Sequence, residues 1–490
     1  MPAKIAVIGA GMTGTAVFFK LVEAIEKNEL PAHQIDIFER SKDFGPGLAY
    51  SMGSDNLLLN RTTRRMYVTN KSDFLDWVNQ QRFDVLRYPV EDQFLPRRVF
   101  GQFLRHLFNQ AMSRAKILGC KVNLVAKSVD GLRQLDDQYI LTTQSEKHGP
   151  YAHLFVCNGN DVTADPYNLK DCPGYHPTSY PISNFFDFED DARVGIIGSR
   201  LTAVDLVIEL YNRKPTLNFT MLSRSSGLPY CAGLPFSATS LTQFNPQNID
   251  NHIAKDGYLS LKDAARLVNK DLRSVGVKKG ILEILNSTDE GGLSGNTGEI
   301  CKIREVLLAA SEYLPYAWQR MAAQDQSVFF SRYKRPWILA RLTMPRNNAT
   351  KMQHLIDSGV LAVTPGITDI SHQANGVFEV TYQNGETRHF DHIINGTGIK
   401  RHCDKMSSPL VCALLDGGLC TRHPYGGVII DPETHFTLNA QGEENASLSV
   451  LGQLAVGNYF MTNSVDGIAV QIDRAIAGYV VKHEQMLSMA

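Results

Sequence analysis

Apolar residues occur in short runs along the N-terminal part of this chain, and the spacing of each run indicates a strand or a helix. Residues 4–8 form a β-branched apolar run, which is typical of a buried strand. Residues 13–27 carry apolar side chains at helical spacing, and residues 34–39 form a second apolar run that ends in an acid. The pattern predicts a strand–helix–strand unit.

The same order returns in the middle of the chain, where a strand is expected at 193–197, a helix at 204–210 and a strand at 219–222. From about residue 235 to 350 the apolar spacing becomes helical. Further helices are expected at 261–275, 300–314 and 317–330, and further strands at 361–363, 376–382, 386–390 and 447–452, with a hairpin turn at Asn384-Gly385 and a closing helix through residue 480. The chain therefore contains two similar units, with a helical insert in the second.

The turn after the first strand is a Gly-x-Gly-x-x-Gly loop, Gly9-Ala10-Gly11-Met12-Thr13-Gly14. Gly9 permits a tight turn, Gly11 lets the backbone approach a pyrophosphate, and Gly14 allows the helix to lie close to the strand. The helix N-terminus adds N–H groups and a partial positive charge that favour phosphates. A strand before the loop and a helix after it predict a dinucleotide site, and the alternative is a Rossmann turn that binds nothing.

Two charged positions extend this predicted site. Glu39 ends the second strand, where a carboxylate can accept hydrogen bonds from both hydroxyls of an adenosine ribose, which favours FAD or NAD over NADP. Arg97, in Pro96-Arg97-Arg98, can bind phosphate oxygens through its planar guanidinium group. A solvated basic turn is the alternative for Arg97.

The second unit departs from the fingerprint. Its turn contains Gly198, Ser199, Arg200 and Thr202, so that Arg200 occupies the place of the middle glycine, and Ala203 occupies the third. Either Arg200 contacts a phosphate itself or this second site is degenerate. Ser223 and Arg224 replace the acid at the next strand end, which suits the 2′-phosphate of NADPH rather than a free ribose. A structural domain that binds no nicotinamide is the alternative.

Later strand ends and the last helix add candidate residues. Glycines end three further apolar strands and can bring backbone close to a cofactor; they are Gly159, Gly398 and Gly452. Asn463 and Ser464 open the closing helix, whose N–H groups could stabilise negative charge on a reduced flavin. No motif for a catalytic acid or base occurs, and His423 is a candidate only because it follows the Gly398 strand.

Composition narrows the class of protein. With 490 residues, two or three domains are expected, and 49 basic against 50 acidic residues leave a net charge of −1, which argues against nucleic acid or a membrane surface as a partner. No segment has the pattern of a signal peptide or a spanning helix, so a cytoplasmic protein is expected. The eight cysteines include no C-x-x-C pair, which argues against a flavin disulfide reductase and a Cys-rich metal site; no metal is expected.

Several motifs together resemble the two-dinucleotide-binding-domain flavoproteins, and more narrowly the bacterial family described as FAD/NAD(P)-binding proteins. They are the loop 9–14, Gly47-Leu48-Ala49-Tyr50, Asp73-Phe74-Leu75-Asp76-Trp77, Pro96-Arg97-Arg98-Val99-Phe100-Gly101, the segment 198–205, Ser223-Arg224 and Asn395-Gly396-Thr397-Gly398. More distantly, the chain is similar to flavin N-hydroxylases of amino acids and amines. The resemblance covers nearly the whole chain and implies non-covalent FAD at Gly9, Gly11, Gly14, Glu39 and Arg97. The family usually has glycine at the position of Arg200.

The expected fold is α/β, with two Rossmann-like dinucleotide-binding domains arranged as in glutathione reductase. The FAD domain would comprise 1–190 and 399–490, and the NAD(P)-binding-like domain 191–398, with the helical insert at about 235–350. The expected function is an FAD-dependent oxidoreductase, a monooxygenase reduced by NADPH that acts on a small polar or amine substrate. An oxidase or dehydrogenase whose substrate reduces the flavin is an alternative, as is a non-catalytic FAD-binding or redox-sensing protein.

Overall fold

The computed structural model describes residues 4–51, 53–81, 90–144, 146–159, 164–224, 227–232, 241–287, 298–397, 406, 408–461 and 465–489. The chain forms two compact units. Unit 1 comprises Met1–Gly53, Arg61–Asp161 and Lys400–Ala490, and unit 2 comprises Ser54–Asn60 and Val162–Ile399. Among the described residues, no helix is both long enough and apolar enough to cross a membrane.

Unit 1 is built on a mostly parallel sheet. Its strands, in order across the sheet, are β18 (Phe436–Leu438), β19 (Glu444–Val450), β7 (His153–Val156), β1 (Lys4–Ile8), β2 (Gln34–Phe38) and β3 (Lys121–Val125). Only β18 runs antiparallel to its neighbour among these strands. The chain proceeds from β1 through β2 to β3 on one side, whereas β7 and β19 lie on the other. The strand order therefore reverses at β1, where α/β sheets bind their ligands beyond the carboxyl ends of the strands.

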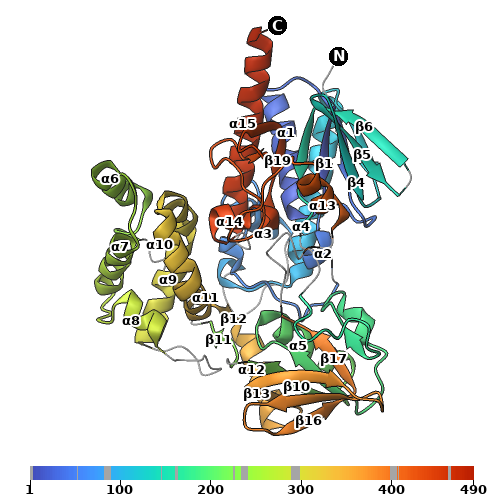
Figure 1. Cartoon of the computed structure of the whole chain (residues 1–490), viewed down its shortest axis with the longest axis vertical. Coiled ribbons are helices and arrows are strands. Elements are labelled where there is room, and N and C mark those ends of the chain that lie inside the picture. Colours follow the sequence, from blue (N-terminus) through green and yellow to red (C-terminus); the bar gives the residue numbers. More distant parts are fainter. Residues whose placement is uncertain are drawn as a thin grey trace. The chain divides into compact units, whose positions relative to one another are not determined.

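Helices and a small meander cover this sheet. Figure 1 shows α1 (Met12–Glu26) beside α15 (Val465–Met489), and the two helices pack against each other. The other helices are α2 (Gly47–Tyr50), α3 (Asp73–Gln80), α4 (Arg97–Ile117), α13 (Pro409–Asp416) and α14 (Val456–Tyr459), and the meander is β4 (Gly131–Leu135), β5 (Gln138–Thr143) and β6 (Glu146–Tyr151).

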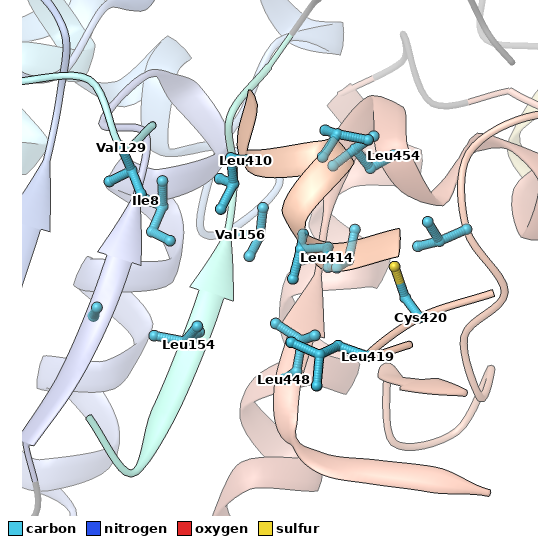
Figure 2. Packing of buried hydrophobic residues seen from close by; sticks show 14 of the residues in the cluster. Ile8, Val129, Leu154, Val156, Leu410, Leu414, Leu419, Cys420, Leu448 and Leu454 are labelled. Carbon is cyan, nitrogen blue, oxygen red and sulfur yellow. The ribbon is translucent and has the colours of Figure 1, made fainter. Parts of the chain in front are cut away.

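The core of unit 1 joins segments that are far apart in the sequence. Figure 2 shows Leu154 and Val156 of β7 in one buried cluster with Leu410 and Leu414 of α13. The same cluster includes Ile8 at the end of β1. Burying these side chains stabilises the carboxyl edge of the sheet, because the last residues of the strands are held by the core.

Unit 2 repeats the plan of unit 1. Its parallel strands, in order across the sheet, are β13 (Leu361–Pro365), β10 (Asn218–Ser223), β9 (Arg193–Ile197), β17 (His392–Asn395) and β8 (Tyr175–His176). Helix α5 (Leu201–Arg213) follows β9, and α12 (Arg346–Asp357) precedes β13. Strand β8 lies before the expected domain boundary at residue 190, and its pairing with β17 assigns it to unit 2.

An antiparallel meander precedes β17 in unit 2, as β4–β6 precede β7 in unit 1. It comprises β14 (Ile367–His372), β15 (Phe378–Tyr382) and β16 (Thr387–Phe390). The predicted hairpin joins β15 to β16: Gly385 has a φ of 81°, and the N–H of Glu386 donates to Asn384 Oδ1 at 3.1 Å. A left-handed residue at this turn favours glycine, so the Asn-Gly signal is confirmed.

The predicted helical insert is present, with helix boundaries that differ from the prediction; the chain leaves the helix at residues 321–322, within the helix expected at 317–330. The helices of the insert are α6 (Pro246–Asp256), α7 (Leu261–Ser274), α8 (Ile281–Asn286), α9 (Glu299–Arg320), α10 (Ala323–Val328) and α11 (Lys334–Arg341), next to the short pair β11 (Tyr230–Cys231) and β12 (Thr343–Met344). The expected break near residue 315 is wrong, since α9 continues through Pro315. Burial of Ala317 and Trp318 on the continued helix offsets the missing N–H of the proline.

Candidate functional site

The loop after β1 requires glycine at its first and third positions. Gly9 has a φ of 96°, and its N–H donates to the carbonyl oxygen of Phe38 at 2.8 Å. A Cβ atom on Gly9 would stand 2.2 Å from the carbonyl oxygen of Cys157, and one on Gly14 would stand 1.8 Å from the carbonyl oxygen of Gly9. Any side chain at either position would displace backbone, so the tight turn depends on both glycines.

Gly11 is the N-cap residue of α1, and its surroundings are different. Its φ of −75° suits any residue, and a Cβ atom would meet its nearest neighbour, the Cα atom of Gly47, at 3.4 Å. No side chain caps the helix. Gly47, with a φ of 59°, packs its backbone directly on Gly11, since a Cβ atom on Gly47 would lie 2.9 Å from the Cα atom of Gly11. The first turn of α1 is thus left without a covering side chain at Gly11.

Glu39 lies beside the loop, just after β2. Its Oε2 accepts the N–H of Ala10 at 3.0 Å, and its Oε1 accepts the N–H of Ser41 at 3.1 Å. The side chain is half-buried. These two bonds hold the carboxylate of Glu39 at the carboxyl edge of the sheet, next to Ala10 in the glycine loop.

The glycines after β7 and β19 lie at the same edge as the loop. Gly159 and Gly452 have φ values of 71° and 74°. A Cβ atom on Gly452 would come within 3.7 Å of Thr13 Oγ1, in the first turn of α1. The N–H of Gly452 donates to Gln471 Oε1 at 2.8 Å. The parallel register of β1, β7 and β19 therefore brings these strand ends together.

Arg97 is the first residue of α4 and belongs to a small basic group. Burial raises the pKa of the Tyr50 hydroxyl, and the positive charges of Arg97 and Arg61 act in the opposite direction, so both guanidinium groups lie near this hydroxyl. Arg61 also forms an ion pair with Asp466 in the first turn of α15. Gly101 permits close packing here, since a Cβ atom on it would stand 2.1 Å from the carbonyl oxygen of Tyr50.

The turn after β9 has the same backbone shape as the first loop. Gly198 has a φ of 111°, and its N–H donates to the carbonyl oxygen of Leu222 at 2.7 Å. Arg200 is the N-cap of α5, with φ −102° and ψ −167°, close to the −75° and −164° of Gly11. The backbone can therefore form this turn with arginine, and what changes is that a side chain begins where the first loop has none.

The neighbours of Arg200 have distinct environments. The hydroxyl of Ser199 is buried and donates to the carbonyl oxygen of Gly227 at 3.0 Å, and Thr202 is half-buried in the first turn of α5. Ala203 is fully buried, which shows that this helix accommodates a methyl group at the third fingerprint position. Ser199 therefore holds the turn to the segment after β10.

Ser223 and Arg224 are expected from the sequence to select a 2′-phosphate, and only one of these two side chains is exposed. Ser223 ends β10 with its side chain buried, whereas Arg224 is exposed. Arg224 lies near Tyr167, because its charge opposes the increase in pKa that burial causes at the Tyr167 hydroxyl. Arg224 alone of the two offers an accessible charge at this strand end.

His423 belongs to a tight turn. The ring Nδ1 of His423 accepts the backbone N–H of Tyr425 at 3.1 Å, and the backbone N–H of His423 donates to the carbonyl oxygen of Gly427 at 2.9 Å. A Cβ atom on Gly457 would stand 2.1 Å from the same Nδ1. Burial lowers the pKa of His423 to about 4, so the neutral ring packs and accepts a hydrogen bond within the turn. Gly398, Asn463 and Ser464 lie outside the described residues.

Comparison with known proteins assigns the part of the chain that carries the first loop. The sequence model of a family described as FAD-NAD(P)-binding matches residues 6–161. Residues 6–161 are therefore similar to the FAD-NAD(P)-binding family. A curated relative, the uncharacterized protein YdhS of Escherichia coli, is 26% identical over 293 residues. That match spans 52% of each chain, about half the length of the relative.

Solved structures share the fold of nearly the whole chain. L-lysine 6-monooxygenase from Pseudomonas syringae matches with a TM-score of 0.59 at 16% identity, covering 97% of this chain and 99% of that one. The ornithine hydroxylase PvdA from Pseudomonas aeruginosa matches with a TM-score of 0.60 at 12% identity, covering 98% and 99%. The cadaverine monooxygenase DfoA from Erwinia amylovora matches with a TM-score of 0.58 at 9% identity, covering 98% of this chain and 94% of DfoA. The predicted α/β fold, with two Rossmann-like dinucleotide-binding domains, is confirmed.

Within the FAD-NAD(P)-binding region and the strands that join it, the structure adds residues that sequence reasoning did not select. Gly47 packs on Gly11, although the sequence named it only as part of the motif Gly47-Leu48-Ala49-Tyr50. Asn158, between β7 and Gly159, has a buried Oδ1 atom with no hydrogen-bond partner among the described residues. Gln471 lies in the middle of α15, where its helical position alone marks it as a core residue. Only the three-dimensional register of the strands brings Gln471 to Gly452.

Proposed function

We propose that this chain is an FAD-dependent oxidoreductase. The observation that carries the proposal is the loop 9–14, in which Gly9 and Gly14 allow a turn that Cβ atoms would obstruct, while Gly11 places no side chain at the N-terminus of α1. An ADP group fits such a loop, because its pyrophosphate needs close approach to backbone N–H groups and favours the positive end of a helix. The family match at residues 6–161 supports the same ligand.

The remaining residues of unit 1 are proposed to hold the rest of FAD. Glu39 would accept hydrogen bonds from the ribose hydroxyls, since its carboxylate already lies beside Ala10. Arg97 would supply positive charge to the phosphates. Gly159 and Gly452 would let the ends of β7 and β19 approach the cofactor without a side chain in between. FAD would accept the hydride of NADPH and use the electrons to reduce O2, so that one oxygen atom enters the substrate and the other leaves as water.

Unit 2 is proposed to bind NADPH. Arg224 offers an exposed charge at the end of β10, which suits a 2′-phosphate. Arg200 lies at the N-cap of α5, where its guanidinium group can reach a pyrophosphate that the N-terminus of α5 attracts. A small polar or amine substrate is proposed because three matched structures are named as acting on lysine, ornithine and cadaverine. Identities of 9–16% make this choice of substrate a proposal from fold likeness.

One observation favours a second candidate, an oxidase or dehydrogenase whose flavin is reduced by the substrate. Arg200 places a side chain where Gly11 places none, and the backbone angles of the two residues agree. If that side chain fills the space that a pyrophosphate needs, unit 2 has a structural role. A non-catalytic FAD-binding or redox-sensing protein would follow if neither nucleotide nor substrate reduced the flavin.

An anaerobic titration of the flavin-loaded protein with NADPH, and separately with NADH, tests the proposal. The absorbance of oxidised flavin is followed, and bleaching at low NADPH concentration is expected. An Arg200→Met variant serves as the comparison, and a roughly tenfold or greater increase in the NADPH concentration needed is expected, because a charge-assisted hydrogen bond is lost. Bleaching by neither nucleotide would overturn the NADPH-dependent mechanism, and tighter NADPH binding by Arg200→Met would show that the side chain obstructs the site.

A further inference from the structure

Gln471 is a buried polar residue. Its side chain forms a hydrogen bond with Gly452, which lies beside the candidate cofactor site. Gln471 lies in the middle of α15, and its side chain has no exposed surface. Its Oε1 accepts the N–H of Gly452 at 2.8 Å. A backbone N–H can only donate, so the amide must present its oxygen to Gly452, and the orientation of the amide is determined by this bond.

The residue that Gln471 holds, Gly452, lies in a turn that requires a left-handed backbone. Gly452 is the second residue after β19, is buried and has a φ of 74°. The N–H of the preceding Leu451 donates to the carbonyl oxygen of Val156 at 3.0 Å, whereas the buried N–H of Gly452 donates to Gln471 Oε1. A buried N–H without an acceptor is costly, so removing Oε1 would favour a different path of the chain after β19.

The position of this turn matters because of what it touches. A Cβ atom on Gly452 would come within 3.7 Å of Thr13 Oγ1, and Thr13 is in the first turn of α1, two residues after Gly11. The turn at Gly452 therefore borders the helix N-terminus to which the pyrophosphate is assigned. A shift of this turn toward Thr13 would narrow that space, and a shift away would open it to water.

We propose that Gln471 is a positioning residue of the FAD site: its Oε1 holds the Gly452 turn beside Thr13, so that the N-terminus of α1 stays open to the pyrophosphate. The inference rests on the proposed function. Gln471 acts through Gly452, not through contact with the cofactor. Its Nε2 atom has no hydrogen-bond partner among the described residues, so the acceptor half of the amide carries the role.

The first experiment compares Gln471→Met with Gln485→Met in the full chain. Methionine has a similar length and no acceptor, and Gln485 is an exposed residue on the same helix. The dissociation constant of FAD is measured by flavin fluorescence, and the 31P NMR signals of the bound pyrophosphate are recorded. Gln471→Met is expected to bind FAD about tenfold more weakly with shifted 31P signals, since one buried hydrogen bond is lost. Gln485→Met is expected to match wild type in both.

A second variant, Gln471→Glu, keeps the test decisive if Gln471→Met does not fold. Glutamate keeps an acceptor at the same reach, and its buried carboxyl group is ionised only at high pH. A protonated carboxyl resembles the amide, whereas an ionised one adds negative charge near the phosphates. FAD affinity relative to wild type is therefore expected to increase as the pH falls from 8 to 6.

Unchanged FAD affinity and 31P signals in Gln471→Met, or an affinity of Gln471→Glu that follows wild type at every pH, would overturn the inference. A lower melting temperature with unmoved 31P signals would also overturn it, because that result marks a role in packing alone. Wild-type protein that binds no FAD would overturn the proposed function itself, so the two failures are distinguishable.

Discussion

A Cβ atom on Gly14 would stand 1.8 Å from the carbonyl oxygen of Gly9, closer than any side chain can approach a backbone oxygen. A Cβ atom on Gly11, three residues earlier, would meet its nearest neighbour, the Cα atom of Gly47, at 3.4 Å, an ordinary contact distance. The two glycines of one loop therefore differ: Gly14 is needed for the turn to form, whereas the turn could form with a methyl group at Gly11, and glycine there leaves the N-terminus of α1 without a side chain.

This difference predicts opposite phenotypes. Gly14→Ala is expected to destabilise the protein by roughly 1–3 kcal/mol, because the helix must shift to admit the methyl group. Gly11→Ala is expected to keep the denaturation midpoint nearly unchanged and to lose FAD binding, since its φ of −75° suits alanine. Urea denaturation and flavin fluorescence measure the two effects. Normal FAD binding by Gly11→Ala would contradict the assignment of the loop to a pyrophosphate.

The exposed charge of Arg224 leads us to expect that unit 2 prefers NADPH to NADH. Arg224→Met is expected to raise the dissociation constant of NADPH about 10- to 100-fold, because a charge-assisted bond to the 2′-phosphate is lost, and to leave NADH unaffected. Anaerobic titration with both nucleotides measures the ratio. Arg213→Met is a suitable control, since Arg213 is exposed at the other end of α5. An equal loss for NADPH and NADH would show that Arg224 does not read the 2′-phosphate.

Substitution of Asp36, which lies away from the glycine loop, is expected to reduce the stability of the protein strongly. The Asp36 carboxylate is buried in β2, accepts Tyr151 Oη at 2.7 Å and Asn123 Nδ2 at 2.6 Å, and lies 3.0 Å from Lys4 Nζ. Burial alone would raise the pKa of Asp36, but the bonds from Tyr151, Asn123 and Lys4 outweigh it and hold this pKa below its usual value. Asp36→Asn is expected to cost about 3 kcal/mol at neutral pH, because a buried charge network is broken.

The pH dependence of this contribution follows from the lowered pKa. The stabilisation is present above the unfolded-state pKa of about 4 and is lost as the pH falls through the folded-state value, where the carboxylate is protonated. Asp190→Asn provides a control, because Asp190 forms an exposed ion pair with Lys214 at 3.1 Å, and no shift of the denaturation midpoint is expected there. Equal midpoints for Asp36→Asn and wild type would contradict the prediction.

The buried side chain of His435 is expected to make the protein less stable in mild acid. It has no exposed surface, and burial, reinforced by the charge of Arg474, lowers its pKa to about 3. The folded protein keeps the ring neutral, whereas the unfolded chain binds a proton below about pH 6.5, so stability falls as the pH decreases from about 6.5 toward 3.

The variant His435→Asn tests this dependence. Asparagine tolerates the φ of 62° at this position and does not titrate. The slope of unfolding free energy against pH in this range is expected to fall by up to about 1.4 kcal/mol per pH unit, the contribution of one proton. His354→Asn, at an exposed position on α12, should leave the slope unchanged. A slope equal to that of wild type in His435→Asn would show that other groups control acid stability.

Local pattern was sufficient for the elements near the first loop. The predicted strand at 4–8 and helix at 13–27 appear as β1 (Lys4–Ile8) and α1 (Met12–Glu26), because apolar period and glycine positions are properties of neighbouring residues. Pattern failed at Pro315, where burial of Trp318 keeps α9 continuous. It also gave Ser223 and Arg224 equal weight, although the structure buries the first and exposes the second.

By itself, the sequence determined the two strand–helix–strand units, the helical insert and the glycine loop at residues 9–14, since each depends on residues that are adjacent in the chain. The tertiary structure alone decided that Gly47 packs on Gly11 and that Gln471 accepts the N–H of Gly452. In these pairs the partners are 19 to 36 residues apart. The segment after β2 meets the loop after β1, and α15 packs on α1 beside the end of β19, so tertiary packing brings the partners together.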